Sequence, residues 1–74
     1  MSFKPRVLIV DDDESITELL SAYLAGFGFE VSTACGGETM REALQRHSVN
    51  LVVLDLMLPG EDGLALSHEL RQNQ

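Results

Sequence analysis

Two apolar runs in this chain are each followed directly by aspartates, and these aspartates are its first candidates for a chemical role. Asp11 and Asp12 come directly after residues 7–10 (Val-Leu-Ile-Val), and Asp55 comes directly after residues 51–54 (Leu-Val-Val-Leu). Carboxylate oxygens gathered at one point bind hard divalent cations such as Mg²⁺. An aspartate can also attack phosphorus to form an aspartyl-phosphate, and a bound cation then neutralises the phosphoryl oxygens. If the two runs lie side by side, the three carboxylates form a candidate site for Mg²⁺ binding and phosphoryl transfer.

The pattern of apolar residues predicts that the two runs are neighbouring strands. Neither run has a polar face, which is typical of parallel strands that are covered by helices on both sides. Residues 29–34 alternate in polarity and include β-branched side chains, as in a half-exposed edge strand. With helical crossovers between parallel strands, the predicted order in the sheet is 2-1-3. Strands 1 and 3 then lie about 4.8 Å apart, and their carboxyl ends place Asp55 beside Asp11 and Asp12.

The segment after the first strand is predicted to be an amphipathic helix. Its apolar residues recur at helical spacing on one side: Ile16, Leu19, Leu20, Tyr23, Leu24 and Phe27. Asp13 is expected to cap the N-terminus of this helix, because an aspartate at that position accepts hydrogen bonds from the first backbone N–H groups. Gly26 and Gly28 are expected to end it, since glycine tolerates the left-handed backbone beyond a helix.

Two further helices complete a β-α-β-α-β-α order. The second is expected to turn Met40, Ala43 and Leu44 inward, with His47 either inward as well or at the surface. Four residues are expected to face outward: Arg41, Glu42, Gln45 and Arg46. The third opens at Asp62-Gly63 and continues through Leu66 and Leu70. Strands alternating with helices in this way predict a doubly wound α/β domain with a parallel sheet.

The composition limits the classes of protein to which the chain can belong. A net charge of −7 argues against direct contact with nucleic acid, because the phosphate backbone requires a basic face. No apolar run approaches the length of a membrane span, and the first residues lack the pattern of a signal peptide. Cys35 is the single cysteine, so it forms no internal disulfide and fits a reducing cytoplasm. We therefore expect a small cytoplasmic domain in which Cys35 has no chemical role.

Other polar residues have simpler structural explanations. Glu61 and Asp62 are expected to be solvated loop and cap residues. His47 and His68 lie in helical segments without a partner at metal-ligand spacing, so each is expected to be a surface or partly buried histidine. Asp55 taken alone would also fit a cap or a turn. Two apolar strands that each end in aspartate are harder to explain by capping, and this conjunction favours a functional site.

Four segments resemble the receiver domain of bacterial two-component response regulators. They are Val10-Asp11-Asp12-Asp13, Gly28-Phe29-Glu30-Val31, Leu54-Asp55-Leu56-Met57-Leu58-Pro59-Gly60 and Asp62-Gly63-Leu64. The stretch LDLMLPGEDGL is most similar to the OmpR-type branch of that family, and the resemblance extends over essentially the whole chain. It implies a flavodoxin-like fold, of which these 74 residues would supply three strands in the order 2-1-3 and three helices.

The resemblance also implies roles for individual residues. Asp55 would be the phosphoacceptor for a sensor histidine kinase, in a Mg²⁺-dependent transfer. Asp12 would be a direct ligand of the metal, Asp11 a ligand through water, and the backbone carbonyl of Met57 a further ligand. The domain would act as a phosphoacceptor rather than as an enzyme, and it would regulate transcription in a full-length protein.

The chain departs from the family pattern at its end. Residues 1–74 correspond to the N-terminal part of a receiver, up to the third helix, so the rest of the receiver and any DNA-binding domain are expected to be absent. The strand at 51–54 would then have an uncovered outer edge, which favours pairing with another chain. An alternative function is therefore a structural half-domain that self-associates through this edge with little phosphoryl transfer. An aspartate-nucleophile phosphohydrolase is disfavoured, because Met57 occupies the position two residues after Asp55 where such enzymes need a second aspartate.

Overall fold

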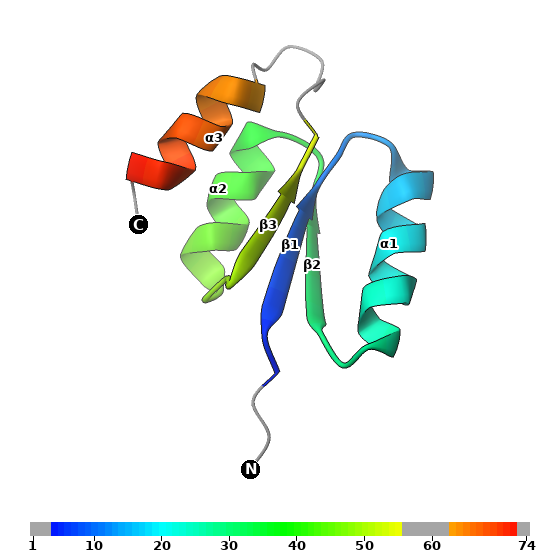
Figure 1. Cartoon of the computed structure of the whole chain (residues 1–74). Coiled ribbons are helices and arrows are strands. Elements are labelled where there is room, and N and C mark those ends of the chain that lie inside the picture. Colours follow the sequence, from blue (N-terminus) through cyan, green and yellow to red (C-terminus); the bar gives the residue numbers. More distant parts are fainter. Residues whose placement is uncertain (1–3, 56–62, 73–74) are drawn as a thin grey trace.

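A computed structural model shows the fold, which is a three-stranded parallel sheet with helices on both sides (Figure 1). The structure describes residues 4–55 and 63–72. The elements in chain order are β1 (Arg6–Val10), α1 (Glu14–Gly26), β2 (Glu30–Ala34), α2 (Gly37–Arg46), β3 (Leu51–Leu54) and α3 (Gly63–Gln72). The sheet order is β2-β1-β3. The predicted doubly wound α/β class and the 2-1-3 strand order are confirmed.

The register of the strands aligns their carboxyl ends at one edge of the sheet. Val10, the last residue of β1, lies opposite Ala34 of β2 and Leu54 of β3. The pairing continues one residue further on both sides of β1. The backbone N–H of Asp11 donates to the carbonyl of Ala34 at 3.0 Å, and the N–H of Asp55 donates to the carbonyl of Val10 at 2.9 Å. The first residues beyond β1 and β3 are therefore held beside each other by the sheet itself.

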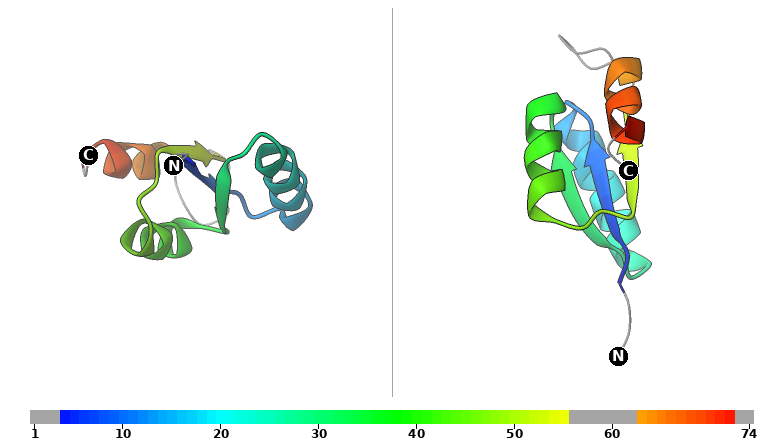
Figure 2. Two further views of the ribbon diagram at one scale, coloured as in Figure 1. Left: turned by 90° about the horizontal axis from the view of Figure 1, so that it is seen from below. Right: turned by 90° about the vertical axis from the view of Figure 1, so that its left-hand side faces the viewer.

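The main core lies between the sheet and α2. Its fully or almost fully buried members are Leu8, Val10, Ala34 and Met40, and the partly buried apolar residues packed against them include Leu44, Val52, Leu54 and Leu70. Burial of one such aliphatic side chain is worth about 1.5–3 kcal/mol. Leu70 brings α3 to this side of the sheet, next to α2, as Figure 2 also shows. This core anchors the strands whose ends carry the aspartates.

The opposite face of the sheet is only partly covered. Val7 and Ile9 of β1 are buried on the side where α1 packs, whereas their β3 neighbours Leu51 and Val53 are 57% and 39% exposed. The prediction that residues 51–54 are covered on both sides is therefore wrong for this face. The reason is that α1 packs against β2 and β1, and none of the helices in the described ranges covers β3 on that side.

The apolar side of α1 is divided between the sheet and the solvent. Thr17 is buried, and Leu20 and Leu24 are half-buried against the sheet. Four of the six residues of the predicted apolar stripe are exposed, by 42–71%: Ile16, Leu19, Tyr23 and Phe27. The apolar stripe is wider than the strip of helix surface that two strands can cover.

The helix ends follow the expected capping chemistry. Asp13 is the N-cap of α1, and Gly28 takes a positive φ of 90° just beyond its end, as predicted. His47 caps the C-terminus of α2 with an extended backbone, and its side chain is exposed. Of the two placements left open for His47, inward or at the surface, the structure shows the surface, because the helix has already ended at Arg46.

Within the ranges 4–55 and 63–72, none of the helices has both the length and the apolar character needed to cross a lipid bilayer.

Candidate functional site

The candidate site is a group of three aspartates at the carboxyl edge of the sheet. One carboxylate oxygen from each of Asp11, Asp12 and Asp55 lies within 4.8 Å of the others. Asp11 and Asp55 are half-buried, and Asp12 is exposed. The convergence of residues 43 or more positions apart, expected from the strand order, is present in the structure.

Three hydrogen bonds hold the backbone around the three aspartates in place. Asp11 is tied to β2 and Asp55 to β1 by the two N–H donations already described. The Oδ1 atom of Asp11 also accepts a hydrogen bond of 2.9 Å from the backbone N–H of Asp13. This bond closes a short turn after β1, so that Asp12 sits at its outer corner. The geometry leaves the second carboxylate oxygen of Asp11 available for another partner.

Asp13 does not belong to the group, because its carboxylate serves α1. Its Oδ1 atom accepts hydrogen bonds from the backbone N–H groups of Ser15 at 2.9 Å and Ile16 at 3.4 Å. An N-cap of this kind is worth about 1 kcal/mol, and its charge also suits the positive end of the helix dipole. The predicted capping role of Asp13 is confirmed. Of the three consecutive aspartates, one therefore caps a helix and two face the end of β3.

The donor set of the group fits Mg²⁺. Its atoms are all carboxylate oxygens, which is the ligand chemistry that this hard cation prefers. Ligands on opposite sides of Mg²⁺ are about 4.2 Å apart, twice the usual metal–oxygen distance of about 2.1 Å. The oxygens of the three carboxylates lie within 4.8 Å of one another, which is close to this value, so one cation would fit among them. Three neighbouring carboxylates also repel one another, and a divalent cation offsets that repulsion.

Several residues named from the sequence lie outside the group or outside the described ranges. The loop residues 56–62, which include Met57, Glu61 and Asp62, are not among those that the structure describes. His47 and His68 are exposed on α2 and α3, and the metal-ligand group found among the described residues contains neither. Cys35 is exposed beyond β2, where its backbone N–H donates to Thr39 Oγ1. Among residues 4–55 and 63–72, the candidate site therefore consists of Asp11, Asp12 and Asp55.

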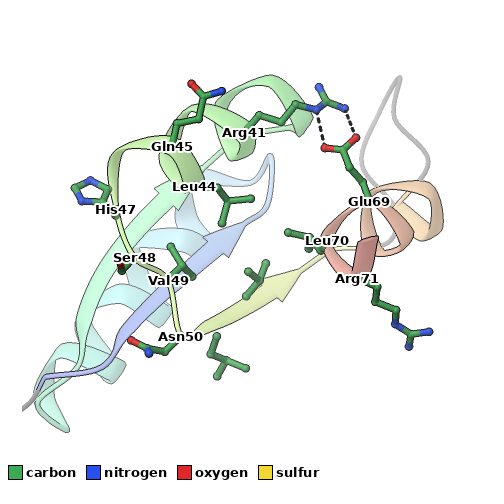
Figure 3. Close-up of a pocket in the computed structure, with 12 residues that line it drawn as sticks. Arg41, Leu44, Gln45, His47, Ser48, Val49, Asn50, Glu69, Leu70 and Arg71 are labelled. Carbon is green, nitrogen blue, oxygen red and sulfur yellow. Dashed lines mark hydrogen bonds and ion pairs between the residues drawn. The ribbon is translucent and has the colours of Figure 1, made fainter. Parts of the chain in front are cut away.

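A groove of about 910 Å³ lies at the other end of β3 (Figure 3). It is bordered by α2, by α3 and by the first residues of β3. Its lining includes Leu44, Val49 and Leu70, and at its rim Arg41 of α2 meets Glu69 of α3. The guanidinium donates from Nε and Nη2 to the two carboxylate oxygens at 2.8 and 3.1 Å. These hydrogen bonds from Arg41 are the main cause of a lowered pKa at Glu69. Sequence reasoning missed this pair, because two surface charges 28 residues apart form no pattern.

A doubly wound α/β fold with an acidic group at the carboxyl edge of its sheet defines the class of protein, and comparison with known proteins defines the family. The profile of the response regulator receiver domain matches residues 7–74. The chain therefore belongs to the response regulator receiver domain family. The predicted resemblance to receivers of OmpR-type regulators and the flavodoxin-like fold are confirmed.

Similar sequences include two bacterial transcriptional regulators that are much longer than this chain. The transcriptional regulatory protein GltR of Pseudomonas aeruginosa is 44% identical over 68 residues, covering 92% of this chain and 28% of GltR. The transcriptional regulatory protein AruR of the same organism is 47% identical over 76 residues, covering 96% of this chain and 31% of AruR. The chain thus spans less than a third of the length of these relatives.

The similar solved structures are receiver domains. The receiver domain of the TMAO respiratory system response regulator TorR superposes with a TM-score of 0.90 at 36% identity, covering 95% of this chain and 58% of that one. The response regulator TrrA of Thermotoga maritima, in complex with Mg²⁺ and BeF, gives a TM-score of 0.87 at 37% identity, covering 95% and 61%. The chain therefore has the fold of the matched part of these domains, while more than a third of each lies outside the match.

Proposed function

We propose that this chain is the phosphoacceptor module of a two-component response regulator that controls transcription from the cytoplasm. Asp55 accepts a phosphoryl group from a sensor histidine kinase, and Asp11, Asp12 and Asp55 hold Mg²⁺. The observation that carries the proposal is the meeting of the three carboxylates at the carboxyl edge of the sheet. Membership of the receiver family and the regulators among its relatives support the same role.

The phosphoryl transfer is a substitution at phosphorus. A carboxylate oxygen of Asp55 attacks the phosphorus of a phosphohistidine on the kinase. The new O–P bond forms as the N–P bond breaks, and the electron pair of that bond returns to the imidazole nitrogen. Bound Mg²⁺ offsets the charge of the phosphoryl oxygens. The residues of the chain orient the carboxylate: the N–H of Asp55 is anchored to Val10, and Asp11 and Asp12 supply the remaining carboxylates of the metal site. The backbone carbonyl of Met57 is proposed as a further ligand.

The assignment of Asp55 is tested with acetyl phosphate and Mg²⁺, followed by intact-mass measurement. We expect wild type to gain the mass of one phosphoryl group, and Asp55→Asn to gain none. Asp13→Asn is the matched control, because asparagine caps a helix as well as aspartate does and Asp13 lies outside the group; this variant should be modified like wild type. Modification of Asp55→Asn to the wild-type extent, or no modification of wild type, would contradict the proposal.

A second candidate function is that of a structural module that self-associates through β3 and transfers little phosphoryl. The observation in its favour is that β3 ends the sheet order among the described strands, with two exposed apolar side chains, Leu51 and Val53. An open edge of this kind favours pairing with another chain. Sedimentation at several concentrations tests this candidate. A monomer at every concentration would contradict it.

A further inference from the structure

The groove between α2 and α3 has the size and the lining of a small-molecule site. This α2–α3 groove, of about 910 Å³, is also lined by residues 47–50 and by the start of β3 (Figure 3). Four half-buried apolar side chains form the part of its lining that continues the core: Leu44, Val49, Val52 and Leu70. Leu44 and Leu70 point toward each other from the two helices. Clefts of about 300–1,000 Å³ that combine apolar walls with a few polar groups are typical of small-molecule sites.

The charge of the groove is opposite in sign to that of the chain. Among the described lining residues, Arg41 and Arg71 are cationic and Glu69 is acidic. The chain as a whole contains 12 acidic residues and has a net charge of −7. An anion is therefore repelled by most of the surface, whereas in the groove the arginines outnumber the carboxylates. This charge distribution favours an anionic ligand over a cationic one.

The two arginines differ in what they can offer to such a ligand. Arg41 donates from Nε and Nη2 to both carboxylate oxygens of Glu69, so the acidic residue of the lining is already occupied. Arg71 is exposed, and no carboxylate among the described residues forms an ion pair with it. A guanidinium presents a planar fork of N–H donors that matches paired anionic oxygens. Arg71 is therefore the side chain expected to meet the anionic group of a ligand.

Neutral side chains add further hydrogen-bond donors to the lining. The Oδ1 atom of Asn50 accepts a hydrogen bond of 2.9 Å from the backbone N–H of Arg6, which fixes the orientation of the amide. The NH₂ group of Asn50 is therefore the part left for another partner. Gln45 and Ser48 also line the groove, with exposed side chains that can donate. Donors thus surround the apolar part of the lining, while its carboxylate is engaged by Arg41.

We propose that the α2–α3 groove binds a small organic anion, a carboxylate or sulfonate that carries an apolar aromatic or aliphatic body. The apolar body lies against Leu44 and Leu70, and the anionic group meets Arg71. Such a ligand contacts both α2 and α3, so it connects the two helices in addition to the Arg41–Glu69 pair. The groove lies at the amino end of β3, whereas Asp55 follows the carboxyl end of that strand. Binding is therefore independent of Mg²⁺ and of phosphorylation.

A second copy of the chain is the competing occupant of the groove. It carries the same net charge of −7, so its binding brings two strongly acidic molecules together at a cost in repulsion. A small anion adds far less charge. A hollow with helices on two sides also encloses a small ligand on several sides, whereas a protein interface extends over about 800 Å² of each partner. Charge and shape together favour the small anion.

The test compares two fluorescent probes that share their aromatic rings and differ in charge. The anionic probe is 8-anilinonaphthalene-1-sulfonate, and the neutral probe is N-phenyl-1-naphthylamine, which lacks the sulfonate. Both are titrated into residues 1–74 at constant ionic strength, without Mg²⁺ or a phosphoryl donor. We expect saturable one-to-one binding of the sulfonate, and binding of the neutral probe weaker by about tenfold because the hydrogen bonds to a charged group are lost. Amide NMR spectra should show shifts in residues 44–52 and 69–71.

The variants separate binding in the groove from the effect of net charge. Arg71→Gln should weaken binding of the sulfonate by about fivefold, as for loss of a partly exposed ion pair. Arg46→Gln is the matched control, because it removes the same charge from an exposed residue of α2 that is not among the lining residues. This control should bind within about twofold of wild type, since exposed charges beyond about 8 Å are screened. Gln45→Glu, which adds a negative charge to the lining, should also weaken binding.

Circular dichroism of the variants checks that each folds like wild type. Absence of saturable sulfonate binding by folded wild type would overturn the proposal, and so would equal affinity for the two probes. Amide shifts confined to α1 would overturn it as well, because the probe would then report the exposed apolar residues of that helix. Equal losses in Arg71→Gln and Arg46→Gln would show that only net charge matters, and would also contradict it. The acetyl phosphate experiment reads out Asp55 independently, so the two proposals fail separately.

Discussion

At the residue scale, the three carboxylates of the site differ in how firmly they are held. Asp11 already accepts a hydrogen bond from the N–H of Asp13 through one oxygen, and Asp55 is half-buried at the end of β3. Asp12 is exposed at the corner of the turn. An exposed carboxylate loses little by turning toward a cation, so we propose that Asp12 is the member of the group that contacts Mg²⁺ directly.

This difference predicts the effect of neutralising single aspartates on Mg²⁺ affinity. Asp12→Asn should weaken Mg²⁺ binding by about tenfold or more, because it removes a charged oxygen ligand, and a tenfold change corresponds to about 1.4 kcal/mol. Asp13→Asn should leave the affinity within about twofold, since Asp13 caps α1. Isothermal titration calorimetry with MgCl₂ at constant ionic strength measures both affinities. Equal losses in the two variants would mean that only the total charge of the loop matters.

At the scale of elements, the order of the strands could be predicted more fully than the packing of other elements against them. Apolar runs and one alternating segment were sufficient to place β2 at the edge and β1 beside β3, and hence Asp55 beside Asp11. Such patterns record which side chains are apolar, but not whether another element covers them. For that reason residues 51–54 were predicted to be covered on both sides, although Leu51 is exposed.

The contact between α2 and α3 was not predictable from the sequence, because it depends on a charged pair on the surface. Arg41 and Glu69 connect the two helices through two hydrogen bonds, and Leu70 adds the apolar contact of α3 with the core. Arg41 was predicted only to face outward. Its partner is fixed by where α3 lies in space, and helical periodicity within α2 carries no information about that.

The Arg41–Glu69 pair predicts that the stability of the contact between α2 and α3 depends on pH. The hydrogen bonds from Arg41 hold the pKa of Glu69 below its ordinary value in the folded chain. The contribution of the pair is therefore complete above the ordinary glutamate pKa and is lost as the pH falls through the lowered folded value. Both side chains are partly exposed, 47% for Arg41 and 36% for Glu69, so the contribution to stability is small.

Carboxyl NMR titration measures this effect directly. Arg41→Gln should raise the titration midpoint of Glu69 towards the ordinary glutamate value, and it should speed amide exchange in α3. Arg46→Gln, which removes an exposed charge from the last turn of α2, is the matched control and should leave the midpoint in place. A Glu69 midpoint that is the same in wild type and Arg41→Gln would show that the pair is not formed in solution.

At the scale of the whole molecule, a chain of 74 residues has a thin margin of stability, and the acidic site reduces it. A chain of this size buries only about 60% of the surface that the unfolded chain exposes, and here one face of the sheet is partly open. The net charge of −7 adds repulsion that favours expansion. A cation that binds Asp11, Asp12 and Asp55 together requires the folded arrangement, because it joins the ends of β1 and β3, which are 43 or more positions apart in sequence.

Mg²⁺ should therefore stabilise the folded chain, by an amount that grows with the logarithm of the Mg²⁺ concentration once this exceeds the dissociation constant. Linkage predicts about 2.7 kcal/mol of added unfolding free energy when Mg²⁺ is present at about 100 times its dissociation constant. For a domain of this size each kcal/mol raises the melting temperature by about 4–8 °C. Thermal unfolding followed by circular dichroism measures the shift, with NaCl at the same ionic strength as the control for screening of the net charge. In Asp11→Asn/Asp12→Asn the specific part of the shift should disappear. If Mg²⁺ raised the melting temperature of that variant as much as that of wild type, the ion would be acting on the net charge of the molecule and not at the three aspartates.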